Sequence, residues 1–459
     1  MASTFKKLTS LLLLTVVFTT LGFGCKAPSA EEQAVIRPVT LNYWTVFGDA
    51  PQLRKFAEQY QKLYPQVTIN IRQVRYEEYD KLFTNALADD VGPDIISVHS
   101  RSLKKYQTRL SSMPAQVKVG HAEERGQYVK ETIIVTDERA MPTASSIRQN
   151  YVTGVAEDAI LGGKVFGLPL SYDNLGLYYN KTLLDQSGIA TAPTTWDELV
   201  EAIKQSNKYD ANNNIIQSGI ALGTGKNIDN SADIFALLMM QKGFDMIRGN
   251  NVVFAQGLEQ NSNTHPALQT LQFYTDFAKV DREVYSWNKD MSNAFESFVR
   301  NKSVFYFGYA YDYARIKARN PQMVLESIPV PQLDPAKPVN IANSWIETVV
   351  KKSKNKDFAW DFIRFMTLPN NIKQYSEAVK VPSPLRQHIE QQKSMPLLGT
   401  FSSQSLTAKN WYRGREWETA KSALQNMIDS SLLQAQEDEE NKRNAILIQQ
   451  SARSISQTL

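Results

Sequence analysis

The chain has 459 residues, of which 21% are charged and 10% aromatic, and its formal net charge at pH 7 is +4. This length is enough for two to three domains with a large buried core. The small net charge does not indicate a nucleic-acid partner or an anionic membrane face. With a single cysteine, the chain forms no internal disulfide framework.

The N-terminus has the pattern of an export signal. Lys6 and Lys7 precede an apolar run from Leu8 to Leu21, which is too short to cross about 30 Å of hydrocarbon as a helix. The run is followed by Cys25, at the place where a bacterial lipoprotein is cut and acylated, although Gly22 stands where such proteins usually have leucine. We expect a signal peptide over 1–24, lipidation at Cys25 and a flexible tether over 25–37. An incidental, unmodified cysteine is the alternative.

Strands and helices alternate in the next part of the chain. Apolar spacing predicts strands over 39–47, 67–71 and 95–98, with helices over 51–64 and about 79–87 between them. Such alternation favours a parallel sheet flanked by helices, and ligands of such sheets bind beyond the carboxyl ends of strands. Trp44, Asp49 and His99 lie there and are therefore ligand candidates. A core position for Trp44 is equally compatible with the pattern.

The region from 100 to 160 is weakly patterned, whereas 163–203 is well defined. A strand over 175–179 ends at Asn180, and a short helix runs toward Gly188. Thr195 and Glu198 have the spacing of a capping box at the start of a further helix. The polar insert before the strand, Ser171-Tyr172-Asp173-Asn174, is a candidate for ligand contacts.

Helices dominate 231–301, and three later segments carry aromatic residues next to polar ones. A strand that begins near 301 ends in a turn with Tyr309, Tyr311 and Asp312. Residues 340–350 form a predicted strand that contains Trp345, and Trp411 and Arg415 precede a helical tail. The four histidines are scattered without ligand spacing, so we expect no metal site and no cofactor.

Three short motifs resemble those of the extracellular solute-binding proteins of family 1, the maltose-binding-like receptors of ABC importers. They are Gly-Lys-Val-Phe-Gly-Leu-Pro at 163–169, Tyr-Tyr-Asn-Lys at 178–181 and Pro-Thr-Thr-Trp-Asp-Glu-Leu at 193–199. The resemblance extends from about residue 39 to 459. It implies an α/β fold with two lobes, the type II periplasmic-binding-protein-like fold, in which each lobe is a mainly parallel sheet flanked by helices and the lobes are joined by crossover strands.

The resemblance also implies a division of the chain and a set of ligand contacts. Lobe 1 would comprise 38–168 plus 345–395, and lobe 2 would comprise 169–344 plus 396–459. In the family, the segment at 163–203 carries the first crossover, the strand at 340–350 the second, and the turn after residue 308 and the region of Trp411 place aromatic rings against the ligand. The expected ligand-binding residues are Trp44, Asp49, His99, Tyr172, Asp173, Asn174, Tyr309, Tyr311, Asp312, Trp345, Trp411 and Arg415.

The resemblance implies a monomeric receptor, lipid-anchored outside the cytoplasm, that binds a sugar and delivers it to permease subunits. Aromatic rings suit the apolar faces of sugars, and carboxylate, amide and guanidinium groups suit their hydroxyls. Two alternatives stay open. An exported carbohydrate-active enzyme needs two facing carboxyl groups, a signal that 47 acidic residues make uninformative. A receptor for a non-sugar solute, such as a glycerol phosphodiester or a peptide, would favour arginine clusters or helix N-termini.

Overall fold

The computed structural model describes residue 33 and residues 36–46, 49–89, 91–126, 131–259, 264–434 and 437–459. The expected signal peptide, Cys25, Phe47 and nearly all of the tether lie outside these residues. Within the described part of the chain, no helix combines the length and the apolar composition that crossing a membrane requires.

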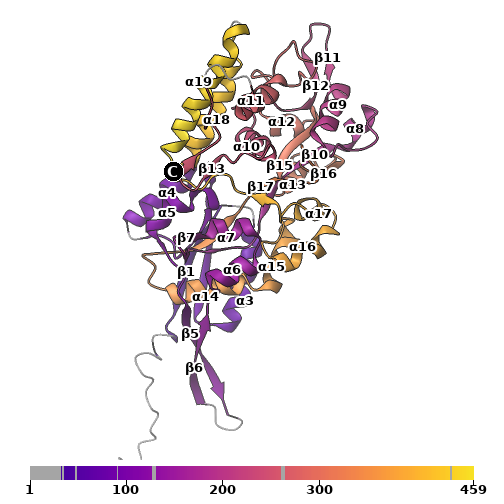
Figure 1. Ribbon diagram of the computed structural model, residues 1–459. Helices are drawn as coiled ribbons and strands as arrows, with labels where there is room; N and C mark the ends of the chain where they lie inside the picture. Colours follow the sequence, from indigo (N-terminus) through magenta and orange to yellow (C-terminus); the bar gives the residue numbers. More distant parts are fainter. Residues whose placement is uncertain are drawn as a thin grey trace, which may run out of the picture.

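Two sheets, stacked end to end in Figure 1, form the framework of the molecule. The first has the order β2 (Val67–Gln73), β1 (Val39–Thr45), β3 (Ile95–His99), β18 (Trp345–Val350) and β4 (Leu110–Ser111), and β9 (Leu168–Pro169) also pairs with β18. The second has the order β11 (Lys208–Tyr209), β12 (Ile215–Ile220), β15 (Ser303–Tyr309), β10 (Asp173–Asn180), β17 (Asn340–Asn343) and β19 (Ala408–Lys409), with β16 (Leu325–Pro329) paired to β10.

The prediction of mainly parallel sheets is wrong, because both sheets are mixed. Only β1 pairs in parallel fashion in the first sheet, with β2 and β3, while β18 is antiparallel to its three neighbours. In the second sheet β10 is antiparallel to β15, β16 and β17. The physical reason lies in the connections: β10 and β18 enter their sheets from the other sheet rather than through a right-handed helical crossover, and they run against the strands already there.

The chain passes between the sheets at short, buried segments. It leaves β9 of the first sheet and enters β10 of the second through residues 170–172, and it returns between β17 and β18 at Ser344. Pro382 and Pro384 lie beside the first passage, because their carbonyl oxygens accept hydrogen bonds from the backbone N–H groups of Tyr172 and Val152. Three segments of the chain, at 170–172, 344 and 382–384, therefore meet at the junction of the two sheets.

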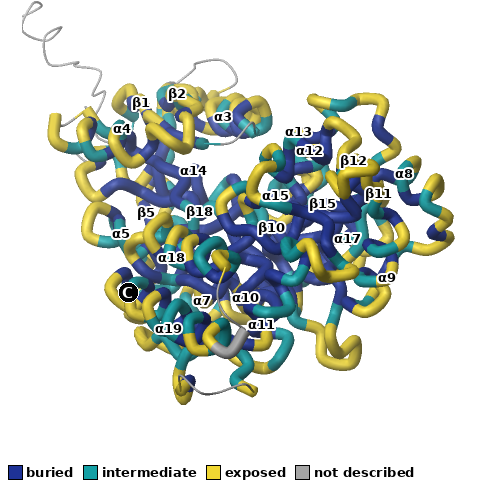
Figure 2. Tube along the Cα trace, turned by 90° about the horizontal axis from the view of Figure 1, so that it is seen from above, coloured by how far each residue is buried: buried dark blue, intermediate teal, exposed yellow. Residues whose placement is uncertain are grey.

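Helices cover the first sheet as the apolar stripes predict. Helix α3 (Ala50–Leu63) buries Leu53, Phe56 and Tyr60, and the Tyr60 ring lies edge-on to Phe362 of α14 (Lys356–Met366), with 5.2 Å between ring centroids. Helix α4 (Tyr76–Ala88) buries a second stripe. These apolar faces make the separate hydrophobic clusters of the lower half in Figure 1. Figure 2 shows the central strands and parts of helices such as α10 and α14 in dark blue, with exposed yellow residues mainly at the periphery.

The second sheet is covered by α9 (Trp196–Ser206), α10 (Ser231–Gln241), α11 (Pro266–Asp276), α18 (Trp417–Ser431) and α19 (Glu437–Ser456). The predicted capping box of α9 is confirmed: Thr195 Oγ1 accepts from the Glu198 N–H at 3.2 Å, and Glu198 Oε2 accepts from the Thr195 N–H at 3.2 Å. Helix α10 is buried from Ser231 to Met240, which explains why its sequence is apolar on all sides.

The weakly patterned region contains a long hairpin that the sequence did not reveal. Its strands are β5 (Gln116–Arg125) and β6 (Glu131–Ala140), which pair in antiparallel fashion along their length and project downward in Figure 1. The remaining elements are short: the 3-10 turns η1 (Ser100–Ser102) and η2 (Gln107–Arg109), α5 (Leu103–Tyr106), α6 (Ala144–Asn150), α7 (Thr153–Ala159), β7 (Ile160–Leu161), β8 (Lys164–Val165), α8 (Lys181–Gln186), β13 (Ile247–Arg248), β14 (Asn251–Val252), α12 (Ala294–Val299), α13 (Asp312–Arg319), α15 (Pro369–Val379), α16 (Arg386–Lys393) and α17 (Leu398–Ser402).

Candidate functional site

A buried arginine marks the junction between the two sheets. Arg101 lies in η1, directly after β3 of the first sheet, and is 3% exposed. Its guanidinium donates to both carboxylate oxygens of Asp233 on α10, from Nη2 to Oδ1 at 2.8 Å and from Nη1 to Oδ2 at 3.2 Å. The two-pronged contact is the geometry that makes an arginine–carboxylate pair strong and directional.

Four further residues surround this pair. The Tyr309 hydroxyl donates to Asp233 Oδ2 at 2.8 Å, and the Trp411 indole N–H donates to Asp233 Oδ1 at 2.6 Å. Asn410 Oδ1 accepts from Arg101 Nε at 3.3 Å, and the Trp417 ring lies under the guanidinium, 4.1 Å from its central carbon to the ring centroid. We call Asp233, Tyr309, Asn410, Trp411 and Trp417 the Arg101 seat.

Electrostatics keep the seat charged despite its burial. Burial lowers the pKa of Arg101, but Asp233 and Tyr309 raise it by more, so the guanidinium stays protonated. Asp233 accepts hydrogen bonds from three side chains, those of Arg101, Tyr309 and Trp411. A buried carboxylate is tolerated only with such partners, because an unpaired charge in this place would cost several kcal/mol.

A second ion pair runs across the same junction in the opposite direction. Arg413, beyond β19, donates from Nε to Asp158 Oδ1 on α7 at 2.6 Å and from Nη2 to Glu157 at 2.8 Å. Burial raises the pKa of Asp158, and Arg413 lowers it part of the way back. Asn410 connects the two pairs, because its amide nitrogen donates to Asp158 Oδ1 at 3.2 Å while its oxygen accepts from Arg101.

The carboxylates predicted for ligand contacts near Tyr309 hold the turn itself. Asp173 accepts from the backbone N–H groups of Ala310 at 2.7 Å and Tyr311 at 3.3 Å, and Asp312 accepts from that of Tyr309 at 3.1 Å. Burial raises the pKa of Asp173 to about 8 and that of Asp312 to about 6. The turn stacks the rings of Tyr309 and Tyr311, with centroids 6.2 Å apart. These two acids therefore position the ring of Tyr309 within the seat and the ring of Tyr311 next to it.

Two members of the polar insert are bound to the protein backbone at the first passage between the sheets. The Tyr172 hydroxyl donates to the Ala408 carbonyl at 2.9 Å, and the Asn174 amide donates to the carbonyls of Tyr172 and Phe401. Both side chains are fully buried. Their polar groups fix the junction of the two sheets.

Trp345 and His99 lie side by side at the end of the first sheet. Their rings meet edge-on at 5.2 Å, and Tyr76 approaches Trp345 at 6.2 Å. Burial and, to a smaller extent, the positive charge of Arg101 together lower the pKa of His99 to about 3, so the ring is neutral. The Tyr76 hydroxyl donates to Glu418 of α18 at 2.8 Å, which places this aromatic group close to the second half of the molecule.

Three predicted residues lie apart from the seat. Trp44 is buried among Ile96, Val98 and their neighbours, with Arg72 stacked over its ring at 4.8 Å. Asp49 accepts from the Tyr375 hydroxyl, and burial raises its pKa. The Arg415 side chain is exposed. The structure thus brings together Tyr309, Tyr311 and Trp411, with Asp173 and Asp312 behind them, and leaves Trp44, Asp49 and Arg415 elsewhere.

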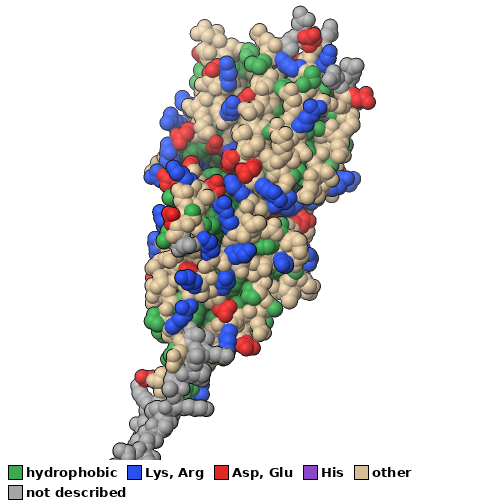
Figure 3. Space-filling view, turned by 90° about the vertical axis from the view of Figure 1, so that its left-hand side faces the viewer, with side chains coloured by type: hydrophobic (Ala, Val, Ile, Leu, Met, Phe, Trp, Pro, Cys, Tyr) green, Lys and Arg blue, Asp and Glu red, His purple; other side chains and the backbone are tan. Residues whose placement is uncertain are grey.

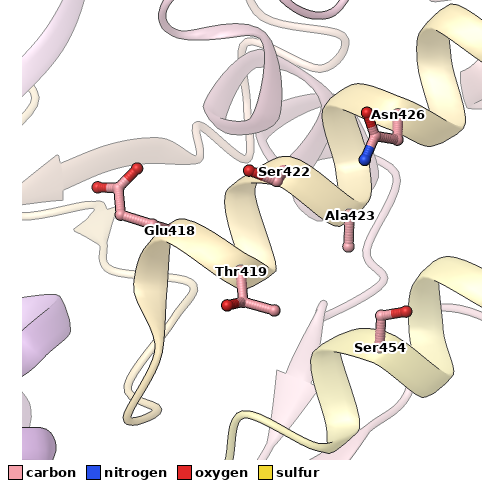
Figure 4. A pocket seen from close by; sticks show the side chains of 6 residues that line it. All are labelled: Glu418, Thr419, Ser422, Ala423, Asn426 and Ser454. Atoms are coloured by element: carbon pink, nitrogen blue, oxygen red, sulfur yellow. The ribbon is translucent and has the colours of Figure 1, made fainter.

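Sequence reasoning missed Arg101, Asp233, Asn410 and Trp417. One signal was available, since Asp233 directly precedes the apolar run from Ile234 to Met240, and an acid buried there needs a partner. Two hollows on the described part of the chain have linings that do not include Arg101 or the residues of its seat. One of about 390 Å³ lies along α18 and α19 and is lined by Glu418, Thr419, Ser422, Ala423, Asn426 and Ser454, mostly short side chains without an aromatic ring (Figure 4).

Comparison with known proteins places the chain in a family. The model of the bacterial extracellular solute-binding proteins matches residues 45–373, which is most of the chain. The protein therefore belongs to the bacterial extracellular solute-binding protein family, and the resemblance of its short motifs is confirmed.

The chain is similar to a curated sequence relative and to several solved structures. The melibiose/raffinose/stachyose-binding protein MelE of Bacillus subtilis is 24% identical over 386 residues, 83% of this chain and 81% of its own. The GacH receptor of Streptomyces glaucescens superposes with a TM-score of 0.66 at 16% identity, over 90% of this chain and 98% of that one. A solute-binding protein of Thermotoga lettingae bound to α-D-tagatose gives 0.66 at 18% identity, over 91% and 99%. The type II periplasmic-binding-protein fold is confirmed.

Proposed function

We propose that the protein is an extracytoplasmic receptor of an ABC importer that binds a carbohydrate between two lobes and delivers it to a permease. The lobes are 38–168 plus 345–395 and 169–344 plus 396–459, centred on the two sheets. The observation that carries the proposal is the Arg101 seat, which gathers a buried carboxylate, an amide and three aromatic rings at the junction of the sheets. Rings for apolar sugar faces and polar groups for hydroxyls are what a sugar site requires.

Names of relatives support a sugar over other solutes. MelE is named for melibiose, raffinose and stachyose, and solved neighbours are bound to maltose, maltotetraose or mannobiose. For an enzyme, a carboxyl group free to act as general acid or base would be needed. Asp233 accepts from three side chains, which argues against that role, and the relative MelE is named as a binding protein.

A thermal-shift screen tests the proposal. The processed chain would be heated with raffinose, melibiose, maltose, mannobiose, glycerol phosphates and short peptides, and each hit would be examined for products after hours of incubation. A ligand at 100 times its dissociation constant adds about 2.7 kcal/mol to the free energy of unfolding, a shift that melting detects readily. We expect a carbohydrate hit without turnover. A ligand that is consumed during incubation would support the alternative of a carbohydrate-active enzyme. Stabilisation only by phosphates or peptides would refute the proposal that the ligand is a sugar.

We also propose that Cys25 carries a lipid that holds the receptor at the outer face of the membrane. The support is the pattern of residues 6–25, a basic pair, an apolar run and then the cysteine. Replacing Cys25 by Ser should move the protein from the membrane fraction to the soluble exported fraction. Continued membrane association of the variant would contradict lipid anchoring.

A further inference from the structure

Arg101 belongs to one half of the molecule and binds the other. Its backbone follows β3, and the neighbouring Ser100 N–H donates to Ser344 at the return passage to the first sheet. The four hydrogen bonds recorded for its guanidinium go to Asp233, Tyr309 and Asn410, on α10, at the end of β15 and beyond β19. The side chain therefore crosses the junction, and these hydrogen bonds end on residues of the second half.

The Arg101 seat has the chemistry of a ligand site and is filled by the protein itself. Tyr309 and Trp411, the rings expected to contact a sugar, both donate to the carboxylate that holds the guanidinium. Trp417 stacks on the guanidinium plane as an aromatic ring would stack on a sugar face. The same donors, acceptor and ring faces cannot serve Arg101 and a sugar at once.

The two arginines cross the junction in opposite directions. Arg101 of the first half pairs with Asp233 of the second, Arg413 of the second pairs with Asp158 of the first, and Asn410 hydrogen-bonds to both pairs. Outside them Lys105 bridges Asp80 of α4 and Glu416 beside α18. Figure 3 shows acidic and basic side chains meeting across the boundary between the upper and lower halves. The two halves are therefore joined directly by ion pairs between their own side chains.

We infer that Arg101 is an internal plug of the ligand site, which latches the empty receptor closed and is displaced when a ligand binds. When the two halves separate, Arg101 and Asp233 are both exposed to water, and Asp233 still accepts hydrogen bonds from Tyr309 and Trp411. Neither charge is then left buried without a partner, so the latch is reversible. A ligand shifts this equilibrium only by contacts that it makes better than Arg101 does. The displacement part rests on the proposed function, whereas the latch itself does not.

Distance measurements on the ligand-free protein test the latch. Spin labels would be attached at Lys62→Cys on α3 and Lys208→Cys on β11, both exposed, in a Cys25→Ser background that removes the only native thiol. We expect one short, narrow distance distribution for this protein. Arg101→Ala should add a longer distance and raise the ratio of open to closed molecules at least tenfold. An unchanged distribution in Arg101→Ala would overturn the latch.

Matched variants separate the latch from general damage. Arg319→Ala removes an exposed arginine that pairs with Glu296 at 2.8 Å within the second half, and it should leave the distribution unchanged. Arg101→Lys keeps the charge but loses the two-pronged contact, so it should open the protein less than Arg101→Ala does, and it serves if the alanine variant does not fold. Opening in Arg319→Ala as well would contradict a specific role for Arg101.

The displacement is tested with the carbohydrate that gives the largest thermal shift in the screen. A plug competes with that carbohydrate, so Arg101→Ala should bind it about tenfold more tightly by calorimetry. Weaker binding would show that Arg101 assists the ligand instead and would overturn displacement. If no carbohydrate binds, the proposed function fails, while the ligand-free distances still decide the latch.

Discussion

The hydroxyl of Tyr172 donates a 2.9 Å hydrogen bond to the carbonyl oxygen of Ala408, joining the first passage between the sheets to β19. Gly154 of α7 lies against this ring, because a Cβ placed there would be 1.9 Å from the Tyr172 Oη and 2.8 Å from its Cζ. The absence of a side chain at Gly154 therefore allows the bond between Tyr172 and Ala408.

Tyr172→Phe should lower the free energy of unfolding by about 1 kcal/mol, the net contribution of one buried hydrogen bond. Gly154→Ala should cost more, because its methyl group has to push the Tyr172 ring away. Urea unfolding of both single variants and of the double variant measures the coupling. We expect the double variant to lose less than the sum of the two, and strict additivity would contradict this packing.

Two tryptophans proposed as ligand contacts should behave differently. Trp411→Ala removes a ring and a donor from the Arg101 seat and should weaken carbohydrate binding by roughly 1–3 kcal/mol. Trp44→Ala opens the core of the first half and should cost about 3–5 kcal/mol of stability. Calorimetry on the fraction of Trp44→Ala that remains folded should find an unchanged affinity for the carbohydrate. Equal affinity losses in both would place Trp44 at the site.

Glu347 should make stability fall as pH rises. It is 4% exposed and accepts from the Tyr43 hydroxyl at 2.5 Å and the Ser97 hydroxyl at 2.7 Å, and burial raises its pKa to about 7. Below about pH 4 the carboxyl group is protonated in folded and unfolded chains alike. Between about pH 4 and 7 the unfolded chain releases the proton more readily, so the free energy of unfolding decreases and stays low above pH 7.

Glu347→Gln removes this contribution and keeps an acceptor for both hydroxyls. At pH 8 the variant should be more stable than the native chain by on the order of 3 kcal/mol, and near pH 4 the two should be similar. Melting curves at several pH values measure the difference. Glu58→Gln, a change at an exposed position of α3, is the control. A constant difference between Glu347→Gln and the native chain at all pH values would contradict this account.

Thr195→Ala breaks the capping box of α9 and should lower stability by about 1 kcal/mol. Thr195→Ser keeps the hydroxyl and should cost little. Urea unfolding compares them, and an equal loss in both would mean that the cap contributes nothing.

The fold was largely predictable because its main elements carry local signals. The capping box at Thr195, the strand that ends at Asn180 and the stripe of Leu53, Phe56 and Tyr60 each act within a few residues, and each was found. Strand direction was not predictable in this way. Whether β18 is antiparallel to β3 depends on a passage between sheets that no local pattern encodes.

The site was less predictable for the same physical reason. Aromatic residues at strand ends indicated Tyr309 and Trp411, but Arg101 and Asp233 are 132 residues apart and meet only in the folded molecule. Asp173 and Asn174 were predicted as ligand contacts because they are polar. Their side chains bind backbone groups, which buried polar residues at a tight passage must do.

The position of β18 also sets the order in which the chain can fold. Residues 345–350 lie between β3, at 95–99, and β4, at 110–111, so the first sheet is split until more than two hundred later residues are available. Contacts so distant in sequence form slowly, because the loop must close before they are gained. The second sheet draws its strands mainly from 173–343, so most of it is available before β18 is. The strands β1 to β4 are therefore synthesised long before β18, the strand that joins β3 to β4.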